Sequence, residues 1–405
     1  MRGMQIIIAV LFVAAPAHAQ QLQDYIEQAQ ANNPNIRAFE LKHSIALEKV
    51  DEVDQLPNTE FGFGYFVSEP ETRTGAQKAR ISAKQMLPWF GTITSNQEYA
   101  HSLAETEYID YLIAKRKLAL DVAKSYYELY GLQSIQLVLD QNIALLKSFE
   151  ELALRSVEVD QASAVDVLRL QIRQNELQQE KQIIAEQFRG EQAKFNHLLN
   201  RDGLLAVTLP TSVEIPDEDP VTLDSLELNP ELVKFDKLYQ SVDQAELLNR
   251  KESAPMFGLG IDYIPVQERP DMNFSDNGKD IIMPMVSVSI PIFNKKHDSR
   301  TRQNELRKQQ ITHQRMDRLN NLESAKAKAI ASRNQARIAF MTQKKNLEQA
   351  RHAEQILIKN YETGTIDFEE VLDIQELQLK FQIRQIQSVQ LYFVQSAIIN
   401  YLVNK

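Results

Sequence analysis

The chain has 405 residues, no cysteine and a formal net charge of −10. The absence of cysteine excludes disulfides, thiolate metal sites, thiol nucleophiles and attachment of lipid through an N-terminal cysteine. The negative charge argues against binding to nucleic acid.

Residues 1–19 have the pattern of a secretory signal peptide. Arg2 supplies the positive flank, Ile6–Ala15 the apolar stretch and Ala17-His18-Ala19 the cleavage site. We therefore expect an exported protein whose mature chain starts near Gln20. The apolar stretch is too short for a transmembrane helix, and no other stretch approaches the length of about 18 apolar residues that such a helix needs.

The first half of the mature chain is predicted to form a helix, a hairpin and two more helices. Apolar residues at helical spacing predict a helix over 22–54, interrupted at Asn32-Asn33-Pro34. A period of two then predicts a β-hairpin over 59–87, with one apolar, aromatic face and one basic, polar face. A long helix from about Thr92 to Val157 and a second one from Ala164 to Leu199 follow.

The second half repeats this plan after a connector rich in Asp, Glu and Pro. A helix over about 230–251 precedes a predicted β-hairpin over 256–292, and two further helices cover about 295–361 and 366–402. The chain is therefore expected to consist of a signal peptide (1–19), a first repeat (20–200), a connector (201–228) and a second repeat (229–405).

Local sequence matches between the halves indicate an internal duplication. Val167-Leu168-Arg169-Leu170-Gln171 matches Val371-Leu372-Asp373-Ile374-Gln375 at an offset of 372 − 168 = 204. Two further matches, at slightly different offsets, pair Asn33-Pro34 with Asn229-Pro230 and Leu87-Pro88-Trp89-Phe90 with Ile290-Pro291-Ile292-Phe293. A repeat of this length is a duplicated supersecondary unit, so we expect a function that uses both halves.

The two predicted hairpins indicate a sheet shared between chains. Two hairpins cannot close a barrel, and every strand edge in a bilayer must be paired. The simplest solution is that several chains pool their strands into one barrel with its apolar face toward lipid. The polar side chains expected to face a wet lumen are Lys78, Arg80, Lys84 and Asp262. The modest, Ala-rich apolar content of the helices favours a hollow tube with walls one helix thick.

The sequence resembles the TolC-type outer-membrane efflux proteins over essentially the whole mature chain. The resemblance is carried by the signal peptide, the duplicated plan, the two Asn-Pro pairs, Leu87-Pro88-Trp89-Phe90-Gly91 and the segment Gly364–Gln375. It is particularly similar to the heavy-metal branch that includes CusC and CzcC. Two departures stand out, because many relatives of that branch carry an N-terminal lipidated cysteine and a glycine at the first helix break, where this chain has Val159–Ser163.

The resemblance implies a mainly α-helical fold with a small β part. It implies a homotrimer in which four strands per chain form a twelve-stranded β-barrel in outer-membrane lipid, continued by a periplasmic α-helical barrel closed at rest. It implies an exit duct, without cofactor or enzymatic activity, for heavy-metal or other cations. The partners would be a periplasmic adaptor (a membrane fusion protein) and an inner-membrane transporter of the RND type. The alternatives are a duct for drugs or for type I protein secretion, and a periplasmic coiled-coil scaffold without a channel.

The helix breaks at 158–166 and 362–370 are expected at the periplasmic tip. The residues predicted to contact the adaptor are Asp160, Ser163, Gly364 and Thr365, with Ser163 also the expected N-cap of its helix. The residues predicted to gate or select cations are Asp166, Asp367, Glu369, Glu370 and Asp373, because one lumen-facing carboxylate per chain becomes a ring in a trimer. An ordinary acidic first turn is the alternative. Arg169 is the nearest candidate for an ion pair across the repeats.

No catalytic or metal-binding motif is present in the sequence. The histidines show no metal-ligand spacing, and no Walker, Gly-x-Ser-x-Gly or His-Glu-x-x-His pattern occurs. Met283 and Met285 could offer thioether ligands to soft cations, but flexible packing or chance is the favoured explanation for them.

Overall fold

The computed structural model describes residues 17–158, 163–219, 226–271, 273–292, 295–363, 365–366 and 368–403. Contacts divide the chain into two compact units, and each unit combines segments of both repeats. Unit 1 holds the residues up to Ala38, Leu112–Asn229 and the residues from Leu319, while unit 2 holds Phe39–Tyr111 and Pro230–Arg318. No helix in the described ranges is both long enough and apolar enough to cross a membrane.

The helices follow the predicted duplication closely. Their bounds are α1 Ala17–Asn32, α2 Pro34–Glu52, α3 Thr92–Glu158, α4 Ala164–Leu198, α5 Pro230–Glu252, α6 Lys296–Glu362 and α7 Phe368–Val403, with a short 3₁₀ turn at Leu226–Leu228. The equivalent helices α3 and α6 have 67 residues each. At 1.5 Å per residue, such a helix is about 100 Å long.

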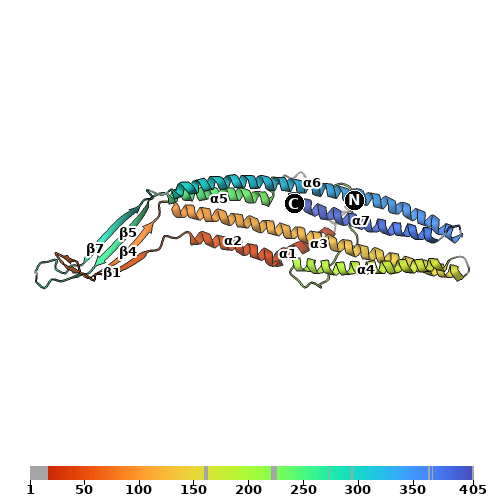
Figure 1. Cartoon of the computed structure of the whole chain (residues 1–405), viewed down its shortest axis with the longest axis horizontal. Helices are drawn as coiled ribbons and strands as arrows, with labels where there is room; N and C mark the ends of the chain where they lie inside the picture. Colours follow the sequence, from red (N-terminus) through yellow and green to blue (C-terminus); the bar gives the residue numbers. More distant parts are fainter. Residues whose placement is uncertain are drawn as a thin grey trace, which may run out of the picture. The chain divides into compact units, whose positions relative to one another are not determined.

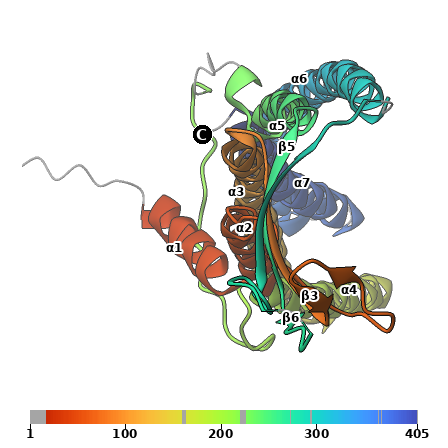
Figure 2. The ribbon, with the colours of Figure 1, turned by 90° about the vertical axis from the view of Figure 1, so that its left-hand side faces the viewer.

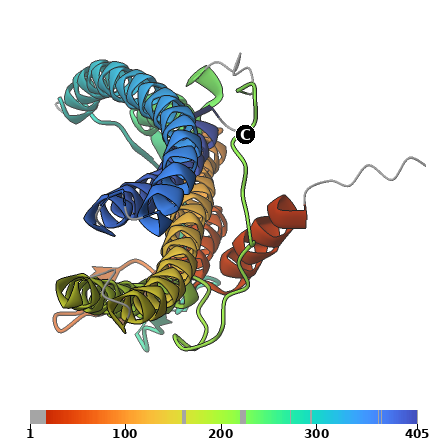
Figure 3. The ribbon, with the colours of Figure 1, turned by 90° about the vertical axis from the view of Figure 1, so that its right-hand side faces the viewer.

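In unit 1, α4 packs along α3 and α7 packs along α6 (Figures 1 and 3). Asn33, at the break between α1 and α2, donates through Nδ2 to the carbonyl of Leu198 at 2.9 Å. Asn229, just before α5, donates in the same way to the carbonyl of Leu402 at 2.8 Å. Each Asn-Pro pair therefore starts a helix and also satisfies a carbonyl at the end of the last helix of its own repeat.

The connector crosses unit 1 as a strap held by hydrogen bonds (Figure 3, green). Its contacts, in chain order, are Gly203 and Leu205 to Asn196 of α4, Thr208 to Tyr25 of α1, Val213 to Tyr130 of α3, and Pro216, Asp217 and Asp219 to Arg337 of α6. Tyr392 of α7 donates to Asp219 at 2.6 Å. The predicted surface connector thus ties five helices together.

Unit 2 contains a four-stranded antiparallel sheet in the order β1-β4-β5-β7 (Figure 1). The strands are β1 Glu60–Tyr65, β4 Ala79–Leu87, β5 Met256–Ile264 and β7 Ile281–Ser289. The pairing of β4 with β5 joins the two predicted hairpins, with Ala83 opposite Ile261. Among the described strands, β1 and β7 have a neighbour on one side only, so the sheet has two open edges.

The second hairpin is shorter than the sequence predicted. We expected it to extend to Ile292, but β7 ends at Ser289. Pro291 has no N–H to contribute to a strand ladder, and the amide of Ile292 instead donates to the carbonyl of Ile290 at 3.0 Å. Phe293, which the sequence repeat matched with Phe90, lies outside the described residues.

The loops of the two hairpins form a small second sheet that the sequence did not predict. Within the predicted hairpins, β2 (Glu71–Thr72), β3 (Gly75–Gln77) and β6 (Val266–Gln267) pair in the order β2-β3-β6 (Figure 2). Two ion pairs of 2.6 Å, Arg73 with Asp276 and Arg269 with Glu71, also join the loops. β3 also pairs with β6 of the other repeat, and local sequence does not reveal such a partner.

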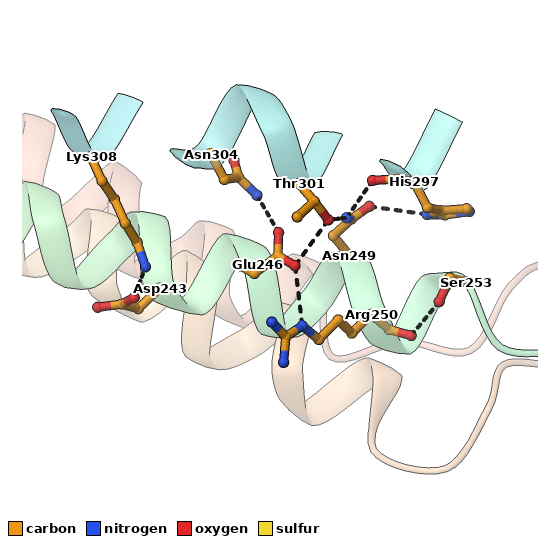
Figure 4. A network of polar contacts seen from close by, with 9 residues as sticks. All are labelled: Asp243, Glu246, Asn249, Arg250, Ser253, His297, Thr301, Asn304 and Lys308. Atoms are coloured by element: carbon orange, nitrogen blue, oxygen red, sulfur yellow. Dashed lines mark hydrogen bonds and ion pairs between the residues drawn. The ribbon is translucent and has the colours of Figure 1, made fainter. Parts of the chain in front are cut away.

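In unit 2, α5 and α6 are joined by a network of polar side chains (Figure 4). Glu246 accepts hydrogen bonds from Asn304 and Thr301 of α6 at 3.0 Å each, and from Arg250 at 3.1 Å. Burial opposes the charged form of Glu246, but these hydrogen bonds outweigh it and lower the pKa of the carboxyl. The network fixes the end of α5 against the start of α6.

Candidate functional site

The sheet has one apolar and one polar face, as the alternation predicted. Opposite residues in an antiparallel pair lie on the same face, so the register assigns each side chain. The apolar face carries Phe61, Phe63, Ile81, Leu259, Ile261, Tyr263, Ile282, Val286 and Val288, all of them exposed. Phe61 is 80% exposed and Val286 75% exposed. A contiguous exposed face of this size marks an interaction surface.

Three of the four predicted lumen residues lie on the polar face of the sheet. Arg80 forms an ion pair with Asp262, whose side chain is fully buried. Lys84 lies beside Gly258, with its Cε 3.4 Å from the position that a Cβ on that glycine would take. Lys78 immediately precedes β4 and pairs instead with Glu69 in the preceding loop.

Met283 and Met285 also lie on the polar face, opposite Asp262 and Gly260. The guanidinium of Arg80 is 4.0 Å from the sulfur of Met285. A fixed cation at that distance disfavours a bound metal ion. Within the described residues, no group of three or more His, Asp or Glu side chains is arranged to hold a metal.

An aromatic cluster marks the end of the sheet from which the chain enters the helices. Trp89 stacks on Phe257, with ring centroids 5.8 Å apart, and contacts Phe90 edge-on at 5.8 Å. Phe90 itself is 79% exposed. Trp and Phe side chains gathered at the end of an apolar strand face are typical of a membrane–water interface.

At the predicted tip, Ser163 is the N-cap of α4, as expected. Its hydroxyl accepts a hydrogen bond from the amide of Val165 at 3.1 Å, and the Asp166 carboxylate accepts one from the Ser163 amide at 3.3 Å. This reciprocal capping box gives Asp166 a local structural role. On the other side of the tip, the Thr365 hydroxyl donates to the carbonyl of Asn360 at 2.8 Å and closes the turn after α6.

The acidic residues after the second helix break, which we call the acidic cluster, are Asp367, Glu369, Glu370 and Asp373. One of them contacts the first repeat. Glu369 pairs with Arg169 at 2.7 Å, the ion pair expected from the sequence, and Arg169 is also 3.9 Å from Asp166. Glu370 and Asp373 are exposed. The remaining predicted tip residues, Asp160, Gly364 and Asp367, lie outside the described residues.

Phe368, the first residue of α7, anchors the tip in the core. It is 2% exposed and packs edge-on against Phe149 of α3 at 5.7 Å and Tyr361 of α6 at 4.9 Å. The hydrophobic cluster around it includes side chains of α3, α4 and α7. The acidic cluster therefore sits on a packed junction of both helix pairs rather than on a free turn.

A duplicated hydrogen-bond motif near the tip was not predicted. In the first repeat, Gln171 and Gln174 of α4 donate to the Glu150 carboxylate of α3 at 2.7 and 2.8 Å. These hydrogen bonds lower the pKa of Glu150. In the second repeat, Gln375 and Gln378 of α7 donate to Glu354 of α6. All three positions match at the offset of 204 that the sequence repeat gave (354 − 150 = 204).

Comparison with known proteins identifies the fold. No family model matches the chain, and no curated protein sequence matches it. The outer-membrane channel OprN matches with a TM-score of 0.76 at 16% identity, over 95% of this chain and 90% of its own. A structure of CusC, described in terms of transmembrane channel formation, matches with a TM-score of 0.76 at 14% identity, over 95% and 92%.

A third match is the outer membrane protein VceC of Vibrio cholerae, with a TM-score of 0.74 at 14% identity, over 95% of this chain and 96% of its own. The chain has the fold of an outer-membrane channel protein. The mainly helical, TolC-like fold with a small β part that the sequence predicted is thereby confirmed. The candidate sites above are accordingly the strand sheet and the tip of a channel-type fold.

Proposed function

We propose that this protein is the outer-membrane exit duct of a tripartite efflux system and works as a homotrimer. The observation that carries the proposal is the four-stranded sheet with an exposed apolar face, a polar opposite face and two open edges. A sheet of this kind is unstable alone in water. Pairing with further copies would satisfy the open strand edges, and insertion in lipid would bury the apolar face.

The strand count fits closure of a barrel from identical chains. Each chain contributes four antiparallel strands, an even number, so β7 of one copy can pair antiparallel with β1 of the next. β4, β5 and β7 have nine residues each, the length of a tilted membrane-spanning strand. In such a barrel the apolar face contacts lipid, and Arg80, Lys84 and Asp262 line the lumen.

The helix pairs supply the proposed gate. In this proposal α3–α4 and α6–α7 form a periplasmic tube, and the helix ends near Ser163 and Thr365 contact the adaptor. The duct opens when adaptor and inner-membrane transporter engage, which separates α4 from α7 and breaks contacts such as that between Arg169 and Glu369. In this proposal the inner-membrane transporter supplies the energy.

Cations of the heavy-metal type are the proposed cargo, moved by a transporter of the RND type. This rests on the sequence resemblance to the CusC and CzcC branch and on the exposed carboxylates of Glu370 and Asp373 at the tip. A ring of such groups in a trimer attracts cations without holding them tightly. Deletion of the gene should sensitise cells to metal salts. Sensitivity to dyes and detergents alone would favour a drug duct instead.

The chain's lack of cysteine permits a direct test of assembly. Variants with one cysteine in β1 and one in β7 should form disulfide-linked trimers in the outer-membrane fraction. Variants with one cysteine in β4 and one in β5 should cross-link only within one chain, because these two strands are already paired. The purified protein should also give stepwise conductance in planar bilayers. A monomer that stays in the periplasmic fraction and gives no conductance would leave the coiled-coil scaffold as the explanation.

A further inference from the structure

Four exposed basic residues cluster where the second hairpin joins its helices. Lys251 is in the last turn of α5, Lys295 and Lys296 lie at the start of α6, and Arg302 follows two turns later. Lys295 and Arg302 are seven positions apart, a spacing that places them on one side of a helix. We call Lys251, Lys295, Lys296 and Arg302 the basic patch.

The two helix ends that carry the basic patch are held together rigidly (Figure 4). Asn249 of α5 donates through Nδ2 to the carbonyl of His297 at 2.9 Å and to the Thr301 hydroxyl at 3.1 Å. Arg300 of α6 forms an ion pair with Glu252 of α5. A groove of about 280 Å³ between α3, α5 and α6 lies next to this pair and is lined by Arg300 and Arg307 as well.

Ion pairs within the described residues do not account for three of the four charges in the basic patch. In the part of the chain that the structure describes, Lys251, Lys295 and Arg302 form no ion pair. The helix dipole favours Lys251 at the end of α5, but it does not explain Lys295 and Lys296, because basic side chains near a helix N-terminus interact unfavourably with the dipole. Something outside the chain must favour this concentration of positive charge.

The first repeat serves as an internal control. When Pro88 is matched with Pro291, the equivalents of Lys295, Lys296 and Arg302 are Thr92, Ile93 and Tyr99. The end of α2, which corresponds to the end of α5, has one basic residue, Lys49, and this residue pairs with Glu52. The first repeat therefore adopts the same helix and hairpin plan without basic residues at the positions of Lys295, Lys296 and Arg302, so this plan does not itself require them.

The basic patch borders the aromatic cluster at the end of the sheet. The ammonium of Lys251 is 3.5 Å from the position that a Cβ on Gly91 would take, next to the exposed ring of Phe90. Aromatic and basic side chains together, at the edge of an exposed apolar face, match the layered chemistry of a membrane surface. Phosphate headgroups lie directly outside the hydrocarbon layer, within reach of long basic side chains.

We propose that the basic patch binds the phosphate headgroups of anionic phospholipids in the leaflet on the helical side of the sheet. The inference rests on the proposed function, since it takes the sheet to span a membrane. Charge complementarity and continuity with the apolar sheet face identify the partner as the lipid surface. Binding there would fix the depth of the sheet in the bilayer and the direction in which the helices leave it.

Lipid retention tests this proposal. The protein is reconstituted in vesicles of phosphatidylethanolamine with and without phosphatidylglycerol, extracted, and examined by native mass spectrometry for bound lipid. The patch variant combines Lys251→Gln, Lys295→Gln, Lys296→Gln and Arg302→Gln. The control variant removes the same charge from exposed residues further along α6 by Lys328→Gln, Lys344→Gln, Lys345→Gln and Arg351→Gln.

Wild type and control should retain phosphatidylglycerol in preference to phosphatidylethanolamine, and the patch variant should lose roughly tenfold or more of that retention, because each basic side chain near an anionic surface contributes several-fold. Equal retention by patch variant and control would overturn the proposal. Failure of wild type to enter either kind of vesicle would contradict the proposed function itself. If the patch variant does not fold, Lys295→Gln and Arg302→Gln, each compared with Lys328→Gln, provide the same test.

Discussion

Arg169 and Glu369 form an ion pair that joins the two repeats, with the Arg169 Nη1 atom 2.7 Å from the Glu369 Oε2 atom across 200 positions of sequence. One turn further on, Arg173 approaches Glu376 at 3.7 Å. Directly beside these contacts, Phe368 is buried against Phe149. The junction of α4 and α7 therefore has a buried hydrophobic contact under a row of exposed ion pairs, and the two layers should respond differently to mutation.

Arg169→Gln should change gating more than stability. The side chains of Arg169 and Glu369 are 44% and 60% exposed, so the pair contributes at most about 1 kcal/mol to the free energy of unfolding. Its loss should nevertheless raise the open probability in planar bilayers, since it removes a contact between helix pairs. Arg189→Gln is the control, because Arg189 forms its ion pair with Glu186 of the same helix, α4. Equal conductance of the two variants would show that the ion pair does not restrain the gate.

Phe368→Ala should lower stability strongly, in contrast to the ion-pair variants. Removing a fully buried aromatic side chain typically costs about 3–5 kcal/mol. Phe368 is 2% exposed and contacts rings of both long helices. Chemical denaturation of the detergent-solubilised protein measures the effect. A loss similar to that of Arg169→Gln would mean that the junction relaxes around the cavity.

The duplicated Glu-Gln-Gln motif should be unequal in strength. Gln378 is 6% exposed, whereas its counterpart Gln174 is only half-buried. Gln378→Ala should therefore lower the free energy of unfolding by about 1–3 kcal/mol, because the carboxylate of Glu354 loses one of its hydrogen-bond donors where water has little access. Gln174→Ala should cost less, and comparing the denaturation midpoints of the two variants checks the order. Equal losses would indicate that burial does not set the contribution.

The first copy of this motif should also make stability depend on pH. Hydrogen bonds from Gln171 and Gln174 lower the pKa of Glu150. A lowered native pKa stabilises the fold above the ordinary carboxyl range near pH 4 and ceases to do so as the pH falls through the native value. The double variant Gln171→Leu, Gln174→Leu should thus be less stable than wild type at about pH 7, with the difference shrinking toward about pH 3. An undiminished difference in acid would contradict this account.

Arg337 should hold the connector strap in place. Burial opposes the charged form of Asp219, but hydrogen bonds from Tyr392 and Arg337 and the charges of Arg333 and Arg337 lower the pKa of this carboxyl. Arg337→Met removes several charge-assisted hydrogen bonds and should cost about 2 kcal/mol. Limited proteolysis should then cut within 201–228 faster than in wild type. The control is Arg351→Met on the same helix, and faster cleavage there as well would point to general loosening.

Adjacent positions on β7 should respond oppositely to a lysine. Val286 lies on the apolar face and Ser287 on the polar face of the sheet. Val286→Lys should reduce the amount of protein in the outer-membrane fraction, since a lysine facing the middle of the bilayer costs about 2–4 kcal/mol. Ser287→Lys should leave insertion unchanged and shift the ion selectivity of conductance toward anions. The same insertion for both variants would contradict the assignment of the apolar face to lipid.

Local patterns in the sequence were sufficient for much of the fold. Alternation of Phe61, Phe63 and Ile81 with polar residues gave the sheet faces, because the period of two is a property of the strand itself. Ser163 was recognised as an N-cap for the same reason. Arg169 was the nearest candidate for an ion pair with the acidic residues of the second repeat, because their own turn contains no Arg.

The sequence analysis did not find side-chain contacts between residues that are far apart in the sequence. Asp219 meets Arg333, Arg337 and Tyr392 more than a hundred residues later, and a charge in a Pro-rich connector gives no sign of such a site. Gln174 and Gln378 carry neither charge nor apolar periodicity, so single helices do not reveal them. Their recurrence at the offset of 204 could have been found by comparing polar positions between the repeats.

The equal length of α3 and α6 restricts how this protein can evolve. Both helices have 67 residues, and each residue added to an α-helix turns everything beyond it by about 100°. A single residue inserted in one helix would rotate the end of that helix away from the side chains that it contacts. The ends of α3 and α6 would then no longer be equivalent in the two repeats. Lengths can change only in steps near seven residues, about two turns, and only in both copies together. We therefore expect an insertion in one long helix to be tolerated only when the other repeat carries an insertion of the same length at the equivalent position.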